Sequence, residues 1–154
     1  MPASYQDIQG IKVVALDIYG TVLATDDCDN TAKPRKGLAD FFDKCDAKGI
    51  KIASTSDAYI PSVKLYLSDC FERHPKARMC LERFDNFFKL NQLPTKDFSI
   101  VIGHYDIATK ELLVIGDNPI KDIGGVSKLG CLSILVPEYR LGNRASFDFS
   151  KIPI

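Results

Sequence analysis

Asp17 is the first side chain in the sequence whose surroundings suit a catalytic role. It follows a short apolar run, residues 13–16, whose β-branched side chains predict a strand that is buried on both faces. Gly20 and Thr21 come next and predict a sharp turn just beyond the carboxylate. Ligands of open α/β sheets bind beyond the carboxyl ends of the strands, so Asp17 lies where chemistry takes place. Taken alone, the stretch fits a turn-capping aspartate better, and the end of the chain shifts that balance.

A second carboxylate follows another apolar run near the end of the chain. Residues 111–115 predict a buried strand, which leads into the sequence GDNPIKD with Asp117 and Asp122. If this strand lies beside that of Asp17, two carboxylates meet, and that arrangement is costly without a cation. Oxygen ligands of this kind suit Mg2+. Asp122 fits either a further acidic group at this site or a charge in the first turn of a helix.

Hydroxyl groups and a lysine lie between these two stretches. The predicted strand at residues 50–55 is followed or ended by Ser54, Thr55 and Ser56. A hydroxyl at the carboxyl end of a strand can hydrogen-bond a bound anion, although a turn with local side-chain bonds fits these residues equally well. Lys96 lies in a predicted loop, where it fits either a charge that partly neutralises a carboxylate or an exposed lysine.

The elements that position these side chains alternate between strand and helix. A strand–helix–strand connection implies a parallel sheet, so the sequence predicts an α/β fold of three layers, a Rossmann-like parallel sheet flanked by helices. Residues 1–10 predict a polar, peripheral segment, and the residues from 137 onward hold no clear element and are expected to pack across the sheet edge. The predicted strands cover residues 13–16, 50–55, 84–90, 111–115 and 131–136, and the predicted helices cover residues 34–48, 58–71, 97–105 and 119–129.

The composition argues against several classes of protein. A chain of 154 residues with 45% hydrophobic and 26% charged residues fits one soluble globular domain. Lys plus Arg equals Asp plus Glu at 20 each, so the net charge indicates no nucleic-acid or acidic-membrane partner. No signal-peptide pattern or membrane-length apolar run occurs, and we expect a cytoplasmic protein. The five cysteines are scattered and never spaced C-x-x-C, which argues against a disulfide framework or a zinc site.

The motifs, taken in order, resemble those of the haloacid dehalogenase superfamily. The matching pattern is a strand followed by Asp-x-Tyr-Gly-Thr, a strand followed by a hydroxyl residue, a loop lysine, and a strand followed by Gly-Asp-x-x-x-x-Asp. The first and last motifs are specific in combination, whereas the middle two are weak alone. The resemblance spans residues 11–136 and implies a single domain over residues 1–154, with residues 137–154 as a C-terminal tail. It also implies a magnesium-dependent phosphohydrolase, that is, a phosphatase.

The resemblance implies a role for each matching residue. Asp17 matches the nucleophilic aspartate that forms a covalent aspartyl-phosphate. Asp117 matches a ligand of Mg2+, and Asp122 matches a second acidic residue that supports the metal shell. Lys96 is expected to orient and partly neutralise Asp17. The catalytic candidates are thus Asp17, Tyr19, Ser56 and Lys96, and the candidates for holding Mg2+ are Asp17, Tyr19, Asp117 and Asp122.

Two of these assignments have alternatives. Ser56 matches the hydroxyl residue of the second motif by its spacing from the preceding glycine, while Thr55 and Ser54 remain candidates. Lys96 matches the lysine of the third motif because F-D…K-D-F resembles the loop of the family. The proline of that loop is absent here, and Lys89 is the alternative lysine.

Tyr19 departs from the pattern of the phosphatases. Phosphatases of the family usually carry an aspartate at this position, which protonates the leaving group and then activates water. A phenol with a pKa of about 10 can donate a proton but is a poor base at neutral pH. Tyrosine here resembles the dehalogenase branch, whose halide leaving group needs no proton. Asp26 and Asp57 are candidates for the missing carboxyl group, although nothing in the sequence positions either.

The spacing of the motifs leaves no room for a sizeable cap domain. Only 38 residues separate Asp17 from Ser56, and 39 separate Ser56 from Lys96. The chain therefore resembles the capless members, which often take large substrates or close their sites through oligomer contacts. The resemblance implies a phosphorylated small molecule or macromolecule as substrate, and a homo-oligomer as one way to cover the site.

These features favour a phosphatase and leave two alternative functions. The capless core and the intact magnesium residues favour hydrolysis of a phosphate ester. Tyr19 favours slow hydrolysis, or a regulatory module that binds phosphate with little or no turnover. A 2-haloacid dehalogenase is the third function, which the lack of room for a cap disfavours.

Overall fold

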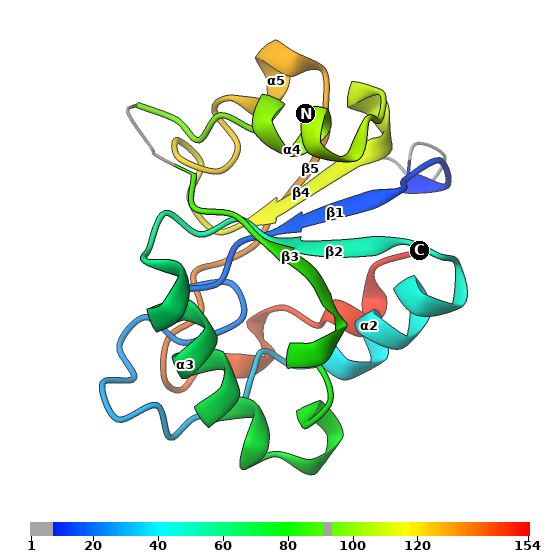
Figure 1. The fold of residues 1–154 in the computed structure, drawn as a ribbon. Coiled ribbons are helices and arrows are strands. Elements are labelled where there is room, and N and C mark those ends of the chain that lie inside the picture. The colour runs from blue at the N-terminus through cyan, green and yellow to red at the C-terminus, as the bar shows by residue number, and fades with distance from the viewer. Residues whose placement is uncertain (1–7, 91–93) are drawn as a thin grey trace.

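A five-stranded sheet forms the centre of the computed structural model, which describes residues 8–90 and 94–154. The strand order is β3-β2-β1-β4-β5, and every neighbouring pair is parallel (Figure 1). This arrangement confirms the predicted α/β fold with a Rossmann-like parallel sheet. The strands are β1 (Val13–Leu16), β2 (Lys51–Ser54), β3 (Phe84–Phe87), β4 (Leu112–Gly116) and β5 (Leu132–Leu135).

Helices on both faces of the sheet give the molecule three layers. The α-helices that the structure describes in full are α2 (Leu38–Ala47), α3 (Ile60–Glu72), α4 (Ser99–Tyr105) and α5 (Val126–Leu129). Figure 1 shows α2 and α3 on one face and α4 and α5 on the other. Short 3-10 helices join these layers, namely η1 (Pro75–Ala77), η2 (Leu81–Arg83), η3 (Thr109–Glu111), η4 (Arg144–Ser146) and η5 (Phe149–Lys151).

Side chains of β1 alternate between two apolar cores, one on each face of the sheet. Val14 and Leu16 pack in the cluster that includes side chains of α2 and α3, and Val13 and Ala15 pack in the cluster with α4 and α5. None of the four is more than 2% exposed. The apolar run before Asp17 is therefore a strand buried on both faces, as predicted.

The helix predicted over residues 119–129 is wrong for most of its length, because α5 begins only at Val126. Turns precede it, and the side-chain oxygen of Asn118 stabilises them by accepting hydrogen bonds from two N–H groups that follow. The carbonyl oxygen of Lys121 accepts a bond of 2.9 Å from the N–H of Lys96, so this segment also supports the lysine loop. The ends of the other predicted elements differ from the observed ones by no more than four residues.

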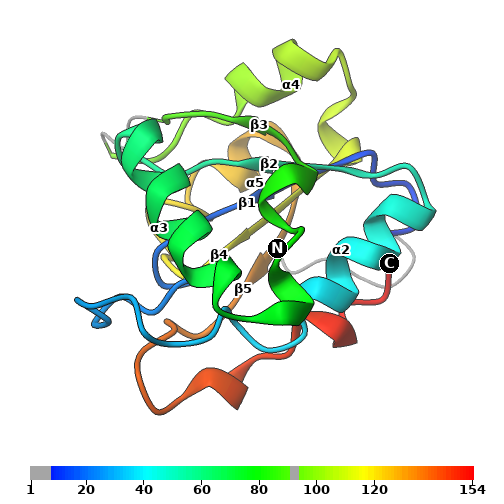
Figure 2. The same cartoon turned by 60° about the horizontal axis from the view of Figure 1, so that its bottom comes forward.

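The tail from Pro137 packs against α2, whereas the sequence led us to expect it across the sheet edge. The N–H of Phe149 donates to the carbonyl oxygen of Lys36 at 2.8 Å. The ring of Phe149 is fully buried and lies 5.4 Å, between centroids, from that of Phe41 in α2. Figure 2 shows the end of the chain beside α2. Burial of this aromatic side chain accounts for the position of the tail.

Two further findings concern membrane-spanning helices and the state of the cysteines. Within the described ranges, no helix is both long enough and apolar enough to cross a membrane. All five cysteines are free; Cys28 is exposed and the other four are buried. Residues 1–7, which belong to the segment expected to be peripheral, lie outside the described residues.

Candidate active site

The ends of three neighbouring strands bring candidate residues to one edge of the sheet. Leu16, the last residue of β1, pairs with Ile115 of β4 and with Ser54 of β2. The N–H of Asp17 continues this ladder by donating to the carbonyl oxygen of Ile115 at 3.0 Å. Asp117 directly follows β4, so its side chain and that of Asp17 leave adjacent strands at the carboxyl edge of the sheet.

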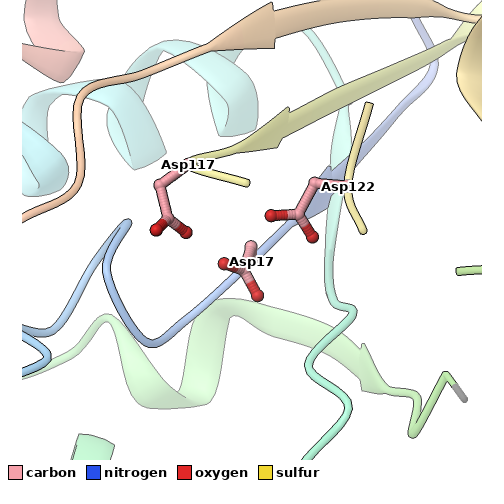
Figure 3. Close-up of side chains that lie close together, drawn as sticks. All are labelled: Asp17, Asp117 and Asp122. Atoms are coloured by element: carbon pink, nitrogen blue, oxygen red, sulfur yellow. The ribbon is translucent and has the colours of Figure 1, made fainter. Parts of the chain in front are cut away.

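Three carboxylates point toward one another at this edge (Figure 3). One oxygen from each of Asp17, Asp117 and Asp122 lies within 4.8 Å of the others. Asp17 is only 7% exposed and Asp122 only 1% exposed. The group therefore concentrates negative charge in a place that water reaches poorly, and such a place favours a bound cation.

Thr21 links two of these carboxylates. Its fully buried hydroxyl oxygen lies 3.2 Å from Oδ2 of Asp17 and 3.2 Å from Oδ1 of Asp117. The turn after β1 positions this hydroxyl, because the carbonyl oxygen of Ile18 accepts hydrogen bonds from three successive N–H groups, the first of them that of Thr21. The turn thereby places this hydroxyl within hydrogen-bond distance of both carboxylates.

Gly20 allows the turn to pass close to Asp117. Its φ is +84°, a left-handed conformation that side chains with a Cβ rarely adopt. A Cβ at this position would also lie 2.5 Å from Oδ2 of Asp117. Glycine is therefore required here both by the backbone and by the approach of the second carboxylate.

Lys96 lies between two of the three carboxylates. Its Nζ is 2.9 Å from Oδ1 of Asp17 and 2.6 Å from Oδ1 of Asp122. The lysine is 3% exposed, so water screens these ion pairs little. Lys89, the alternative in the sequence, is exposed. The structure therefore brings Lys96 to the carboxylates.

The pKa values of these groups reflect the competition between burial and charge. Burial raises the pKa of Asp17 from 3.8 to about 6, although Lys96 opposes the shift, and Asp117 adds to it. Burial, followed by repulsion from Asp17, raises the pKa of Asp122 to about 6. Burial lowers the pKa of Lys96, but attraction to the two carboxylates outweighs it, and the net shift is upward. One lysine thus compensates only part of the cost of burying the acidic cluster.

The donor atoms of this cluster fit a hard divalent cation such as Mg2+. All three side chains offer carboxylate oxygens, which are the ligands that Mg2+ prefers. Three negative charges meet one ammonium group, which leaves an excess of negative charge for a cation to balance. Asp17 and Asp117 directly follow the ends of two strands. The carboxylate of Asp122 accepts hydrogen bonds from Nζ of Lys96 and from the N–H of Asn118.

A cavity of about 290 Å³ opens onto the carboxylates. Most of its lining is polar or charged, as expected for a site that receives an anionic group together with a cation. Thr25 and Glu138 form part of the wall, and the hydroxyl of Thr25 donates to Glu138 at 2.7 Å. The lining residues are Asp17, Tyr19, Thr25, Asp57, Lys96, Asp117, Asn118, Lys121, Asp122 and Glu138.

Tyr19 lines the cavity, but its ring packs against an aromatic ring of α3 rather than against the carboxylates. It packs edge-on against Tyr66 of α3, with 6.1 Å between ring centroids. Burial and the neighbouring Tyr66 raise the pKa of the Tyr19 phenol, which therefore stays protonated at neutral pH. In the described part of the chain, no hydrogen bond joins this phenol to the carboxylates. The assignment of Tyr19 to the metal site stays a prediction.

The hydroxyl groups at the end of β2 and just after it are buried and are absent from the lining of the cavity. Ser56, the predicted second-motif residue, uses its side-chain oxygen to accept a hydrogen bond of 3.1 Å from the N–H of Ala58. The hydroxyl of Thr55 is buried without a hydrogen-bond partner among the described residues. Thr55 lies beside Asp17, because Ser54 pairs with Leu16 and the N–H of Thr55 donates to the carbonyl oxygen of Leu16 at 3.0 Å. Among the described residues no hydrogen bond joins Ser54, Thr55 or Ser56 to the carboxylates, and a role in binding phosphate stays a prediction for each.

Several residues of the site were missed from the sequence. Thr21 stands in the first motif, so its position four residues after Asp17 was a usable signal, but only its turn was predicted. Asn118 follows Asp117 directly and orients Asp122 through its N–H. Glu138 lies in the tail, and no local pattern links it to the site. Only the packing of the tail reveals its position.

No protein-family model matches this chain, and no curated protein matches it in sequence. Solved structures do match it in fold. A predicted phosphoglycolate phosphatase from Haemophilus somnus matches with a TM-score of 0.67 and 13% identity, over 93% of this chain and 96% of that chain. The L-2-haloacid dehalogenase from Xanthobacter autotrophicus matches with a TM-score of 0.59 and 14% identity, over 82% and 77% of the two chains.

A third match contains a metal ion. It is the N-terminal part of a Bacteroides fragilis protein, which contains a phosphatase domain complexed with Mg, with a TM-score of 0.61 and 20% identity over 86% of this chain and 39% of that chain. Likenesses at such low identity establish the fold. Two of these three neighbours are described as a phosphatase or as containing a phosphatase domain, and the third is a haloacid dehalogenase. The chain therefore shares the fold of these phosphatases and of the haloacid dehalogenase, the family that its motifs resemble.

Proposed function

We propose that this protein is a magnesium-dependent phosphohydrolase that forms an aspartyl-phosphate on Asp17. The observation that carries the proposal is the placement of the Asp17 carboxylate between the ammonium group of Lys96 and the hydroxyl of Thr21. Both oxygens of Asp17 are held, and the side chain still lines a cavity. A carboxylate that is oriented in this way, and partly neutralised, is suited to attack an electrophile.

The proposed reaction has two displacements. An oxygen of Asp17 attacks phosphorus, the bond from phosphorus to the leaving oxygen breaks, and that oxygen takes up a proton. Water then attacks the phosphorus of the aspartyl-phosphate and gives up a proton, and the bond to Asp17 breaks. Inorganic phosphate leaves and the carboxylate is regenerated. Such a site works mainly through positioning and electrostatics.

Charge compensation is the main task of the other residues. A phosphate ester is anionic, so it is repelled by the same carboxylates that must receive it. Lys96 offsets part of this repulsion and holds Asp17 in place. Asp17 and Asp117 would hold Mg2+, with Asp122 behind them, and the bound ion supplies the positive charge that polarises the phosphoryl group.

Proton transfer is the least usual part of this proposal. Tyr19 can donate a proton to the leaving oxygen, but its raised pKa makes it a poor base for water. Of the two carboxyl groups expected from the sequence, Asp57 lines the cavity. Asp26 is absent from the lining, and its Oδ1 accepts the N–H of Leu141. Glu138 joins Asp57 as a candidate base because it lines the same cavity.

The proposed substrate is a phosphorylated small molecule or macromolecule. The cavity at Asp17 holds about 290 Å³, enough for a phosphoryl group and the atoms next to it but not for a large substrate. The rest of such a substrate would lie outside the cavity, against solvent or a second copy of this chain. We place the protein in the cytoplasm, a compartment in which its free cysteines stay reduced.

Turnover of p-nitrophenyl phosphate, with Mg2+ and with EDTA, tests the proposed function. We expect activity that requires Mg2+ and that falls by at least ~10³-fold in Asp17→Asn, because the nucleophile is lost. Asp29→Asn, at an exposed aspartate, is the matched control and should retain the wild-type rate. Acid quenching during turnover should yield a peptide phosphorylated at Asp17. Equal rates for wild type and Asp17→Asn would remove Asp17 from the mechanism.

Tyr19 supports the alternative of a module that binds phosphate with little turnover. Tight binding of inorganic phosphate in the presence of Mg2+, without hydrolysis across a panel of phosphorylated substrates, would favour that function. A 2-haloacid dehalogenase would instead release halide from a 2-haloacid without Mg2+. Ordinary rates of phosphate release would exclude both alternatives.

A further inference from the structure

A cavity of about 530 Å³, larger than the one at Asp17, lies between the start of α2, η1 and the C-terminal tail. Figure 2 shows these three segments side by side, far apart though they are in the sequence. No residue of this cavity also lines the cavity of the candidate active site. Its volume lies in the range of pockets that hold small organic molecules.

Positive charge is concentrated around this cavity. Lys33, Arg35, Lys76 and Arg144 line it, and Asp40 is its one acidic lining residue. In the described part of the chain, neither lysine nor Arg144 forms a salt bridge with a carboxylate. Cations that the protein leaves unpaired around one cavity create a potential that attracts an anion.

The start of α2 adds to this potential. Gly37 and Leu38 line the cavity, and Gly37, as the N-cap residue, has no side chain to accept hydrogen bonds from the first turn. The helix has ten residues, so its N-terminus carries a partial positive charge, which Asp40 in the first turn offsets in part. Backbone N–H groups at such a position can bind the oxygens of an anion.

His74 also lines the cavity and is half-buried. Its Nε2 atom is buried and has no hydrogen-bond partner in the described part of the chain. A ligand in the cavity would lie beside the imidazole without reaching this atom, so the ring reports on binding rather than supplying a contact. Burial, and then the nearby Lys33, lower the pKa of His74, and a bound anion would oppose both effects.

Apolar side chains complete the lining. Pro34, Leu38, Pro75 and Ala77 lie among the charged groups. A bare inorganic ion would leave this surface exposed to water, whereas an organic molecule would cover it. The lining therefore combines sites for anionic oxygens with a surface for an apolar or aromatic body.

We propose that this cavity is a second binding site, for a small organic anion that carries a phosphate or carboxylate group on an apolar or aromatic body. Lys33, Lys76, Arg144 and the N-terminus of α2 bind the charged group, and the imidazole of His74 lies beside it. The body of the ligand packs against Pro75, which is exposed. Binding here does not depend on the proposed function of Asp17.

The two histidines of the sequence provide a direct test, because His104 is an internal control. His104 lies on α4, on the opposite face of the sheet, and its Nε2 lies 3.3 Å from the side-chain amide of Asn86. We would record imidazole C–H resonances by NMR during titration with adenosine 5′-monophosphate, with phthalate and with neutral adenosine. EDTA and the Asp17→Asn variant keep the nucleotide intact during the titration.

We expect at least one of the two anions to shift the His74 resonance in a saturable manner, while His104 stays unchanged and adenosine has no effect. Phosphate and carboxylate specificity are distinguished by which anion binds more tightly. The double variant Lys33→Glu/Lys76→Glu should weaken binding at least tenfold. Both lysines are exposed, so the variant should fold, and its amide spectrum checks this. Lys128→Glu, at an exposed lysine on α5, should bind as the wild type does.

Two results would overturn the proposal. One is the absence of any shift of the His74 resonance with either anion at concentrations up to about 10 mM, which is roughly ten times a millimolar Kd. The other is equal affinity in the double variant and in Lys128→Glu, which would show that the charges of the cavity do not select the ligand.

Discussion

Lys96 and burial act in opposite directions on the protonation of Asp17 and Asp122. Its ammonium group lies within 3 Å of oxygens of Asp17 and Asp122, and all three side chains are buried. Even so, the pKa values of both aspartates are raised to about 6, because burial outweighs the attraction. At neutral pH both carboxyl groups are mainly ionised, which a nucleophile requires, and they lie close to the pH at which protons compete.

Replacement of Lys96 by methionine should remove most of the activity. The substitution keeps the apolar stem but deletes the charge that orients Asp17 and offsets the charge of the phosphate. We expect kcat for p-nitrophenyl phosphate to fall at least ~100-fold, the scale seen when one electrostatic contact to a transition state is lost. Lys89→Met, at the alternative lysine, is the matched control and should leave kcat unchanged. A similar loss in both variants would contradict the assignment of Lys96.

Tyr19→Asp should raise the rate of hydrolysis. Tyr19 lines the cavity but its phenol is a poor base, so the attack of water on the aspartyl-phosphate lacks an efficient proton acceptor at this position. A carboxylate there supplies one, and the expected gain is up to ~10²-fold, a typical contribution of general acid–base catalysis. Steady-state turnover and the lifetime of the phosphorylated enzyme measure it. Tyr19→Phe, which adds no base, is the control. Turnover that does not rise would show that another group, such as Glu138 or Asp57, already performs this step.

At the scale of elements, the ends of strands were predictable and the paths of loops were not. The apolar runs before Asp17 and Asp117 identify two strands, and the order of neighbouring parallel strands then brings their ends together. The start of α5 was not predictable, because a side chain of Asn118 and the approach of the Lys96 loop replace the first turns of the helix. Local patterns record propensity, whereas these contacts depend on the finished fold.

Arg35 joins the turn after β1 to the tail, and no sequence pattern indicated it. The side chain is fully buried, and its two terminal nitrogens donate to the carbonyl oxygens of Gly20, Thr21 and Pro137 and to the hydroxyl of Ser146. Its guanidinium also lies 5.2 Å from the ring centroid of Tyr139. The turn and the tail are thus held by one side chain, although more than 100 residues separate them in the sequence.

Arg35→Met should therefore destabilise the fold. Methionine fills part of the space but leaves buried carbonyl groups without a donor, and we expect a loss of roughly 2–4 kcal/mol in the free energy of unfolding. Urea denaturation should show a lower midpoint with an unchanged slope. Arg140→Met is the control, since the ion pair of Arg140 with Glu138 is solvent-exposed and should contribute less than ~1 kcal/mol. Equal losses in the two variants would show that Arg35 does not have the role described.

In the molecule as a whole, the segments between the motifs form part of the sheet and of the helices that pack on it. The described residues between Asp17 and Lys96 form α2, β2, α3 and β3, which belong to the sheet or pack on it, together with short helices and turns. The cluster of aspartates is therefore assembled by the entire topology and stays open on the side of its cavity. Burying Asp17 and Asp122 beside Asp117 in this way costs stability, and bound Mg2+ should recover it.

The pH dependence of stability should reveal this cost. Asp17 and Asp122 have pKa values of about 6 in the folded protein against an ordinary value of 3.8, so the folded state binds more protons than the unfolded state between these values. The contribution of the two groups to the free energy of unfolding of the metal-free protein therefore falls as the pH rises from about 4 to about 6. A carboxylate with a lowered pKa would give the opposite trend.

Mg2+ should stabilise the protein more at pH 7.5 than at pH 5, because at pH 5 it must displace protons from both carboxyl groups. Binding at about 100 times the Kd adds about 2.7 kcal/mol, which corresponds to a rise of roughly 5–10 °C in Tm for a chain of this size. Scanning calorimetry at the two pH values, with Mg2+ or with EDTA, measures the difference. Asp117→Asn should reduce the rise at pH 7.5, whereas Asp29→Asn should not. A rise that is independent of pH, or unchanged in Asp117→Asn, would show that Mg2+ binds elsewhere.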